Sequence, residues 1–180
     1  MDSRYEPNSD GVPIDLFLSK KKKSLINFTD SSSKLVFSVH PPPPPTLFKR
    51  LLSDSSGNSL IYISHNQKAT WEGFSNEENE PMFRVERTTN TLTRVEFEVF
   101  LKGENKSPEF KMRGSPFYRS CTIYKGDSIV AQTSLMYKLG IQKVLVPRNR
   151  FRLTIFPGYA DHAFIAALTV IFFYGRNFWI

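Results

Sequence analysis

The stretch DHAFIAALTVIFFYGR, residues 161–176, decides between two folds for this chain. From Ala163 to Tyr174 it is apolar, with Thr169 as a mild interruption. A helix that is apolar on every face lies either in a membrane or inside protein. The class of protein therefore depends on whether this segment spans a bilayer or fills a core.

The length of the segment favours a core. A helix over residues 163–174 would cover about 18 Å, whereas the hydrocarbon layer of a bilayer is about 30 Å thick. Extending the helix would place Arg176 in lipid, at a cost of roughly 3 kcal/mol. Asp161 is a suitable N-cap and Gly175 a suitable C′ residue. We therefore predict a core helix over about residues 160–174 and no transmembrane span.

The preceding sequence alternates with the period of a β-strand. In TRVEFEVFL, residues 93–101, Val95, Phe97 and Val99 point one way and the charged residues between them point the other. FRLTIF, residues 151–156, repeats the pattern, and Gly126-Asp127 marks a hairpin between two further strands. The body of the chain is therefore predicted to be mainly β.

Read in this way, the chain contains about twelve strands, near residues 13–18, 24–28, 34–39, 46–52, 59–64, 69–74, 81–86, 93–101, 108–113, 118–124, 128–137 and 150–156. Closing the sheet would remove its exposed edges. A barrel of this size is too wide for its own side chains to fill. We expect a closed β-barrel of about twelve strands around a central hydrophobic C-terminal helix. It would form one domain over residues 12–175, with a flexible N-terminus (1–11) and a short tail (176–180).

Positive charge is concentrated in the second part of the chain. The net charge is +7, but residues 1–105 hold 13 Lys/Arg and 14 Asp/Glu, whereas residues 106–180 hold 11 and 3. Such asymmetry indicates an anionic partner, such as phospholipid headgroups or nucleic acid, although excess charge can simply keep a protein soluble.

Two groups of basic residues are candidate binding sites. We predict that one barrel face binds an anionic ligand by charge-assisted hydrogen bonds, and its candidates are Lys111, Arg113, Lys138, Lys143, Arg148, Arg150 and Arg152. A second patch could meet a membrane surface, and it consists of Lys20, Lys21, Lys22 and Lys23. For both groups the alternative is a solvated rim around an apolar core.

No pattern in the sequence indicates catalysis or a cofactor. His40, His65 and His162 are not at the spacing of metal ligands, and phosphate-binding and nucleophile motifs are missing. Cys121 is the only cysteine and lies among apolar residues in a predicted strand. We expect a non-enzymatic, monomeric protein without metal or cofactor. The polar N-terminus lacks a signal-peptide pattern, so we expect it in the cytoplasm, with the nucleus or the membrane surface as alternatives.

The chain resembles the LURP-one-related proteins of plants, which belong to the tubby C-terminal-like superfamily together with the phospholipid scramblases. The segments that carry the resemblance are SSSKLVFSV (31–39), LLSDSSGNSLIYIS (51–64), PMFRVERT (81–88), VEFEVFL (95–101), FKMRGSPFYRSCTIY (110–124), IVAQTSLMYK (129–138) and FRLTIFPGYADHAFIAALTVI (151–171). The strand, the Pro-Gly and the Asp before the apolar helix are the most specific part. The resemblance covers roughly residues 12 to 174.

The resemblance implies the fold more strongly than the biochemistry, since one fold hosts many functions. It implies an association with plant defence, and a superfamily that includes a phosphoinositide-binding domain. We therefore expect a barrel domain that binds anionic phospholipid headgroups, such as phosphoinositide, or a protein partner. The alternatives are a nucleic-acid-associated transcription regulator of the tubby type and a scramblase-like membrane protein. Nucleic acid is the less favoured partner, because the strong helix is apolar and cannot enter a groove.

Overall fold

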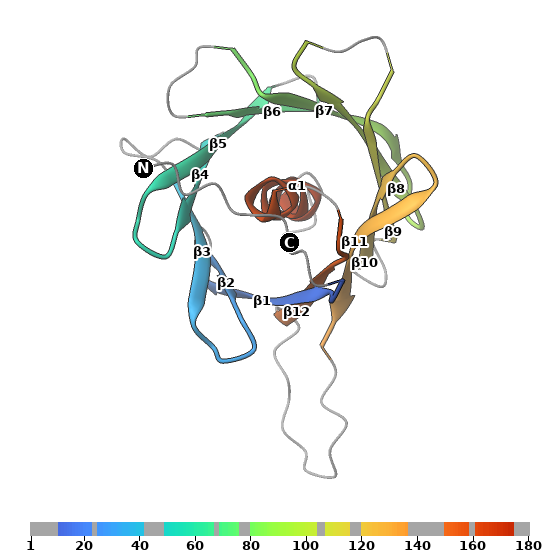
Figure 1. Cartoon of the computed structure of the whole chain (residues 1–180). Helices are drawn as coiled ribbons and strands as arrows, with labels where there is room; N and C mark the ends of the chain where they lie inside the picture. Colours follow the sequence, from blue (N-terminus) through green and yellow to red (C-terminus); the bar gives the residue numbers. More distant parts are fainter. Residues whose placement is uncertain are drawn as a thin grey trace.

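Alternate side chains along each strand point to one side of the sheet, and the sheet closes around a helix. In a computed structural model, the described residues form a closed antiparallel barrel, with α1 (His162–Tyr174) running through its centre (Figure 1). The structure describes residues 11–22, 25–41, 49–66, 69–75, 80–103, 107–115, 120–136, 150–158 and 161–174. The mainly β prediction, the barrel and the central helix are confirmed.

The strands follow one another around the barrel in chain order, and the first pairs with the last. They are β1 (Ile14–Lys22), β2 (Leu25–Thr29), β3 (Leu35–His40), β4 (Lys49–Asp54), β5 (Ser59–Asn66), β6 (Thr70–Phe74), β7 (Phe83–Asn90), β8 (Val95–Leu101), β9 (Phe110–Ser115), β10 (Ser120–Lys125), β11 (Ser128–Leu135) and β12 (Arg150–Ile155). The closing pair runs from Ile14 opposite Ile155 to Ser19 opposite Arg150. All neighbouring strands are antiparallel, so short connections suffice.

The barrel interior is an apolar core shared by the strands and the helix. The helix is buried from Ala163 to Phe173, on all of its faces. Phe97 from β8 meets Phe172 edge to face, with ring centroids 5.7 Å apart. The Thr169 hydroxyl donates to the Ile165 carbonyl oxygen at 2.8 Å, so this buried polar group is satisfied within the helix. The apolar segment is therefore a core helix.

The start of the helix follows the expected capping chemistry. The Asp161 side-chain Oδ1 accepts a hydrogen bond from the Ala163 backbone N–H at 2.8 Å, and the Asp161 carbonyl oxygen accepts one from the Ile165 N–H at 3.2 Å. Gly158 adopts a positive φ of 84°, which turns the chain from β12 toward the helix. Asp161 is thus confirmed as the N-cap, while Gly175 lies outside the described residues. Over the part of the chain that is described, no helix is long and apolar enough to cross a membrane.

Some strands extend further than the sequence predicts. β1 continues through Lys20, Lys21 and Lys22 instead of ending near residue 18, because Lys20 and Lys22 pair with β2. β7 continues to Asn90 instead of residue 86, because its polar end pairs with β8 beyond a bulge at Arg87/Thr89. Backbone pairing carries both strands past the point where the apolar alternation stops. The hairpin at Gly126-Asp127 is confirmed, since Lys125 faces Ser128 across it.

Gly73 of β6 leaves room for an aromatic ring from the neighbouring strand. A Cβ at this position would overlap with Cζ of the Phe83 ring, well inside van der Waals contact. Phe83 faces Gly73 across the β6–β7 pair and is almost completely buried. The absence of a side chain at residue 73 therefore allows the Phe83 ring to pack over the β6 backbone.

We expect Gly73→Ala to destabilise the protein by about 1–3 kcal/mol, because the added methyl group must displace the Phe83 ring. The measurement is the free energy of unfolding in urea. Phe83→Leu serves as the partner in a double-mutant cycle, and the double variant should be more stable than the sum of the two single effects predicts. Additive effects would show that the contact does not limit the space at residue 73.

Candidate functional site

Two arginines of β12 lie on the outside of the barrel. Arg150 and Arg152 are exposed, whereas Phe151 and Leu153 between and beyond them are buried in the core. The Cα atoms of residues i and i+2 in a strand are about 7 Å apart, so the side chains of Arg150 and Arg152 leave β12 close to each other and on the same face. We call the exposed Arg150 and Arg152 side chains the β12 face.

Few carboxylates lie near the β12 face. Among the described residues of β1, β2, β11 and β12, Asp15 is the single acidic residue. Its Oδ2 lies 3.9 Å from Arg152 Nη1, and its Oδ1 accepts a hydrogen bond from the Thr154 hydroxyl. An exposed pair at this distance contributes little binding energy, so it leaves Arg152 able to bind another anion.

A pocket of about 370 Å³ adjoins Arg150. We call it the β12 pocket. Its lining comes from β1, β2, the turn after β2, and the ends of β11 and β12, and consists of Phe17, Leu18, Ser19, Thr29, Asp30, Ser31, Ser33, Met136 and Arg150. Asp30 Oδ1 accepts hydrogen bonds from the backbone N–H groups of Ser32 and Lys34, both at 2.9 Å. The turn therefore holds the Asp30 carboxylate with two backbone N–H groups, and beside it the pocket offers a guanidinium group and several hydroxyls.

The predicted site residues on β9 lie on a different part of the barrel. Lys111 Nζ is 3.5 Å from Glu98 Oε1, and Arg113 Nε is 3.0 Å from Glu96 Oε1. Two strands, β10 and β11, separate β9 from β12. The structure thus pairs Lys111 and Arg113 with carboxylates of β8 and does not bring them together with Arg150 and Arg152.

The electrostatics of Glu96 agree with this pairing. Burial raises the pKa of Glu96, but the hydrogen bonds from Arg94 and Thr89 and the charges of Arg94 and Arg113 outweigh burial, so the net pKa lies below its usual value. Glu96 is therefore a stable negative partner for Arg113 near neutral pH.

The remaining predicted site residues are described only in part. Lys138, Lys143 and Arg148 lie outside the described residues. Lys20, Lys21 and Lys22 belong to β1, which pairs with β12 on one side and β2 on the other. Lys23 lies outside the described residues.

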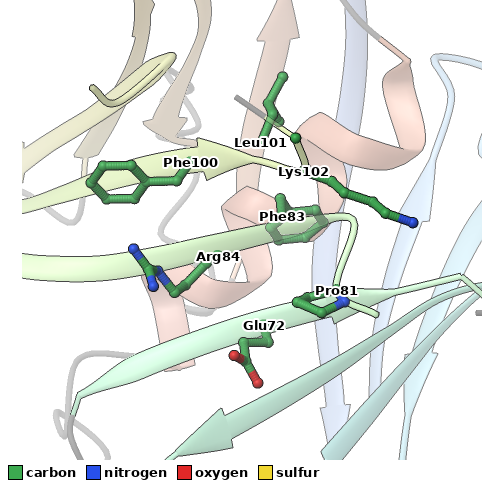
Figure 2. Close-up of a pocket in the computed structure, with 8 residues that line it drawn as sticks. Glu72, Pro81, Phe83, Arg84, Phe100, Leu101 and Lys102 are labelled. Atoms are coloured by element: carbon green, nitrogen blue, oxygen red, sulfur yellow. The ribbon is translucent and has the colours of Figure 1, made fainter. Parts of the chain in front are cut away.

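A second pocket, of about 400 Å³, lies where β6, β7 and β8 expose their outer side chains (Figure 2). Glu72, Arg84 and Phe100 face one another across the three strands, and the Arg84 guanidinium carbon lies 5.1 Å from the centre of the Phe100 ring. Arg84 Nε is 3.1 Å from Glu86 Oε1, and Lys102 Nζ is 3.4 Å from Glu80 Oε2. Its basic groups have carboxylates as ion-pair partners, so an anion in this pocket would have to compete with Glu86 and Glu80.

Three polar side chains on inward-facing positions of their strands, Arg50, His65 and Arg87, were not predicted from the sequence. Arg87 is two residues after Val85 and four after Phe83 in β7, and this period-two spacing indicates an inward-facing position. His65 of β5 stacks on Trp71, with ring centroids 4.6 Å apart. Arg50 places its guanidinium carbon 4.8 Å from the Tyr174 ring centre, near the end of α1. These residues make one end of the barrel interior more polar than alternation alone suggests.

The described residues offer little for metal or thiol chemistry. Within them, no three His, Cys, Asp or Glu side chains gather in a way that could hold a metal ion. Cys121 is buried, and its backbone N–H donates to the Thr133 hydroxyl at 2.8 Å. Burial keeps this thiol from reagents in solution.

The comparisons with known proteins agree with the barrel. The sequence model of a family described as "LURP-one-related" matches residues 14–173. Protein LURP-one-related 7 of Arabidopsis thaliana is 42% identical over 181 residues, which cover 95% of this chain and 96% of that protein. Protein LURP-one-related 15 of the same plant is 31% identical over 172 residues, or 88% of this chain and 78% of that one. A crystal structure of an Arabidopsis thaliana protein superposes with a TM-score of 0.68 at 27% identity, covering 92% of this chain and 93% of the other.

Two histidines make stability depend on pH. Burial lowers the pKa of His65 below 6.5, and the charge of Arg87 lowers it further. Burial also lowers the pKa of His162, although the nearby Asp161 partly opposes this shift. Below about pH 6.5 the unfolded chain therefore binds more protons than the folded chain, so the free energy of unfolding falls as the pH falls.

We expect the free energy of unfolding, measured in urea, to decrease between about pH 7.5 and pH 5. His162→Gln should flatten this dependence, because it removes one group whose protonation favours the unfolded state. An unchanged pH dependence in the variant would contradict the assignment.

Proposed function

Because the chain belongs to the plant LURP-one-related family, we propose that it is a non-enzymatic binding domain whose β12 face takes the headgroup of an anionic phospholipid. The membrane surface would be a cytoplasmic one, met peripherally by the outside of the barrel. The observation that carries this proposal is Arg150, an exposed arginine that has no carboxylate partner among the described residues and borders a pocket rich in hydroxyls.

Phosphate chemistry fits the β12 face. A guanidinium group can bind two phosphate oxygens at once, which makes arginine well suited to a phosphorylated headgroup. The Ser19, Thr29 and Ser31 hydroxyls border the same pocket and can donate to phosphate oxygens or to the hydroxyls of a headgroup. The same site can therefore bind both the charged and the neutral polar groups of a lipid headgroup.

Long-range attraction adds to these contacts. The sequence that joins β11 to β12 carries Lys138, Lys143 and Arg148 and no acidic residue. Each basic residue close to an anionic membrane contributes about 1 kcal/mol, and salt screens this attraction. Binding by this mechanism involves no covalent step.

The other candidate functions have less support. DNA readout commonly uses an exposed helix, whereas α1 is enclosed by the strands. A scramblase-like role would require the same helix to lie in lipid. A protein partner for the β12 face is a possible outcome of the test that follows.

We expect detergent-free protein to float with vesicles that contain phosphoinositide and not with neutral vesicles, and to lose binding at high salt. Arg150→Gln with Arg152→Gln should weaken vesicle binding by about 30-fold, the equivalent of about 2 kcal/mol for two charges. The measurement is the fraction of protein that floats as a function of accessible anionic lipid.

Lys111→Gln with Arg113→Gln is the matched control, because it also removes two exposed charges from alternate positions of one strand. These positions are about 14 Å around the barrel from β12, beyond the Debye length at physiological salt. The control should bind within about twofold of the unchanged protein. Equal losses in both variants would argue against a specific β12 face. A protein that does not float at all would redirect the search to a protein partner.

A further inference from the structure

The end of the barrel where α1 begins contains a third pocket, of about 360 Å³. We call it the mouth pocket. The lining residues that determine its chemistry include Met82, Phe83, Leu101, Phe110, Lys125 and Phe164. They come from the ends of β7, β8, β9 and β10 and from the first turn of the helix. It shares no residue with the β12 pocket. A ligand here would therefore use a separate part of the molecule.

The inner wall of the mouth pocket is aromatic. Phe164 of α1 meets Phe83 edge to face with ring centroids 5.1 Å apart, and meets Phe110 in the same way at 5.3 Å. Met82 is partly buried against this cluster. The buried phenyl rings form the floor of the pocket, and the partly buried Met82 and Leu101 side chains offer an apolar surface that can adapt to a ring. The volume lies at the low end of the range of small-molecule sites, about 300–1,000 Å³.

The charges at the mouth pocket are already matched. Lys125 Nζ lies 2.9 Å from Glu109 Oε1 and also stands 5.5 Å from the Phe110 ring centre. Asp161 uses its carboxylate to cap the helix, where the partial positive charge of the N-terminus compensates it. An anionic ligand would have to compete with Glu109 for Lys125 while approaching Asp161. The local charges therefore favour a ligand without net charge.

Two side chains drawn in Figure 2 belong to both pockets. Phe83 and Leu101 line both the mouth pocket and the pocket on the outside of β6, β7 and β8. Glu72 and Arg84 line the outer pocket, whereas Lys125 and Asp161 line the mouth pocket. The two shared side chains thus form a wall between the pockets.

We propose that the mouth pocket binds a neutral, apolar small molecule that contains a ring. Its ring would pack on Met82, Leu101 and the edge of Phe164, above the buried Phe83 and Phe110, and the Lys125–Glu109 pair would stay intact at the edge. This site does not depend on the headgroup site on β12, and either can exist without the other.

The methionines of the chain allow the test to locate the ligand. The chain has four, Met1, Met82, Met112 and Met136. Met82 lines the mouth pocket, Met136 lines the β12 pocket, and Met112 is completely buried. We would label the methionine methyl groups with ¹³C in the full chain and titrate the neutral probe phenyl-naphthylamine. The Met82 methyl signal should shift in a saturable way while the Met112 and Met136 signals stay in place.

A charged probe with the same rings tests the ligand class. Anilino-naphthalene sulfonate adds one negative charge, and we expect it to bind at least about tenfold more weakly than phenyl-naphthylamine. Equal affinities of the two probes would overturn the neutral assignment. Shifts confined to Met112 or Met136, or no saturable shift, would overturn the site.

Filling the pocket gives a second test. Met82→Trp should weaken phenyl-naphthylamine binding by at least about tenfold, because the indole occupies the ligand volume. Leu92→Trp is the matched control, since it places the same side chain at a strongly exposed position between β7 and β8. Binding that survives Met82→Trp in a folded protein would overturn the proposal, and vesicle flotation of that variant reports separately on the β12 face.

Discussion

The helix at the centre of the barrel has no polar face, and the rest of the structure depends on that fact. Residues from Ala163 to Phe173 are buried all around the helix axis. Such a helix is stable only where apolar surroundings replace water on every side. A twelve-stranded barrel cannot fill its own interior, so the strands need the helix as much as the helix needs the strands. Neither part would be a stable fold by itself.

This mutual dependence restricts where polar chemistry can take place. Most inward positions of the strands are apolar and are used to cover α1, so binding groups must lie on the outer faces or at the two ends of the barrel. The two ends differ. Arg50, Arg87 and His65 make the end near Tyr174 polar, whereas the pocket at the end near Asp161 is lined mainly by apolar side chains.

Much of the fold was predictable because the decisive signals are local. Alternation along the strands, the turn at Gly126-Asp127 and the cap at Asp161 each depend on a few neighbouring residues, and the structure has all three. The grouping of the basic residues was less predictable. The sequence predicted that Lys111 and Arg113 belong to a positive cluster. The β8–β9 register instead places Glu98 and Glu96 directly opposite them. Register is a property of two strands, and the charges of one strand do not reveal it.

Strand pairing decides which basic residues remain available for a partner. The second part of the chain has a large positive excess, and its β9 strand pairs with β8, which brings carboxylates from the more acidic first part. β12 pairs with β11 and, where the barrel closes, with β1, and the described residues of these strands contribute Asp15 alone as a carboxylate. Closure therefore converts an uneven distribution of charge along the sequence into an uneven distribution around the barrel. On the outside of β9, Lys111 and Arg113 both face carboxylates, whereas on the outside of β12 only Arg152 has a carboxylate partner among the described residues.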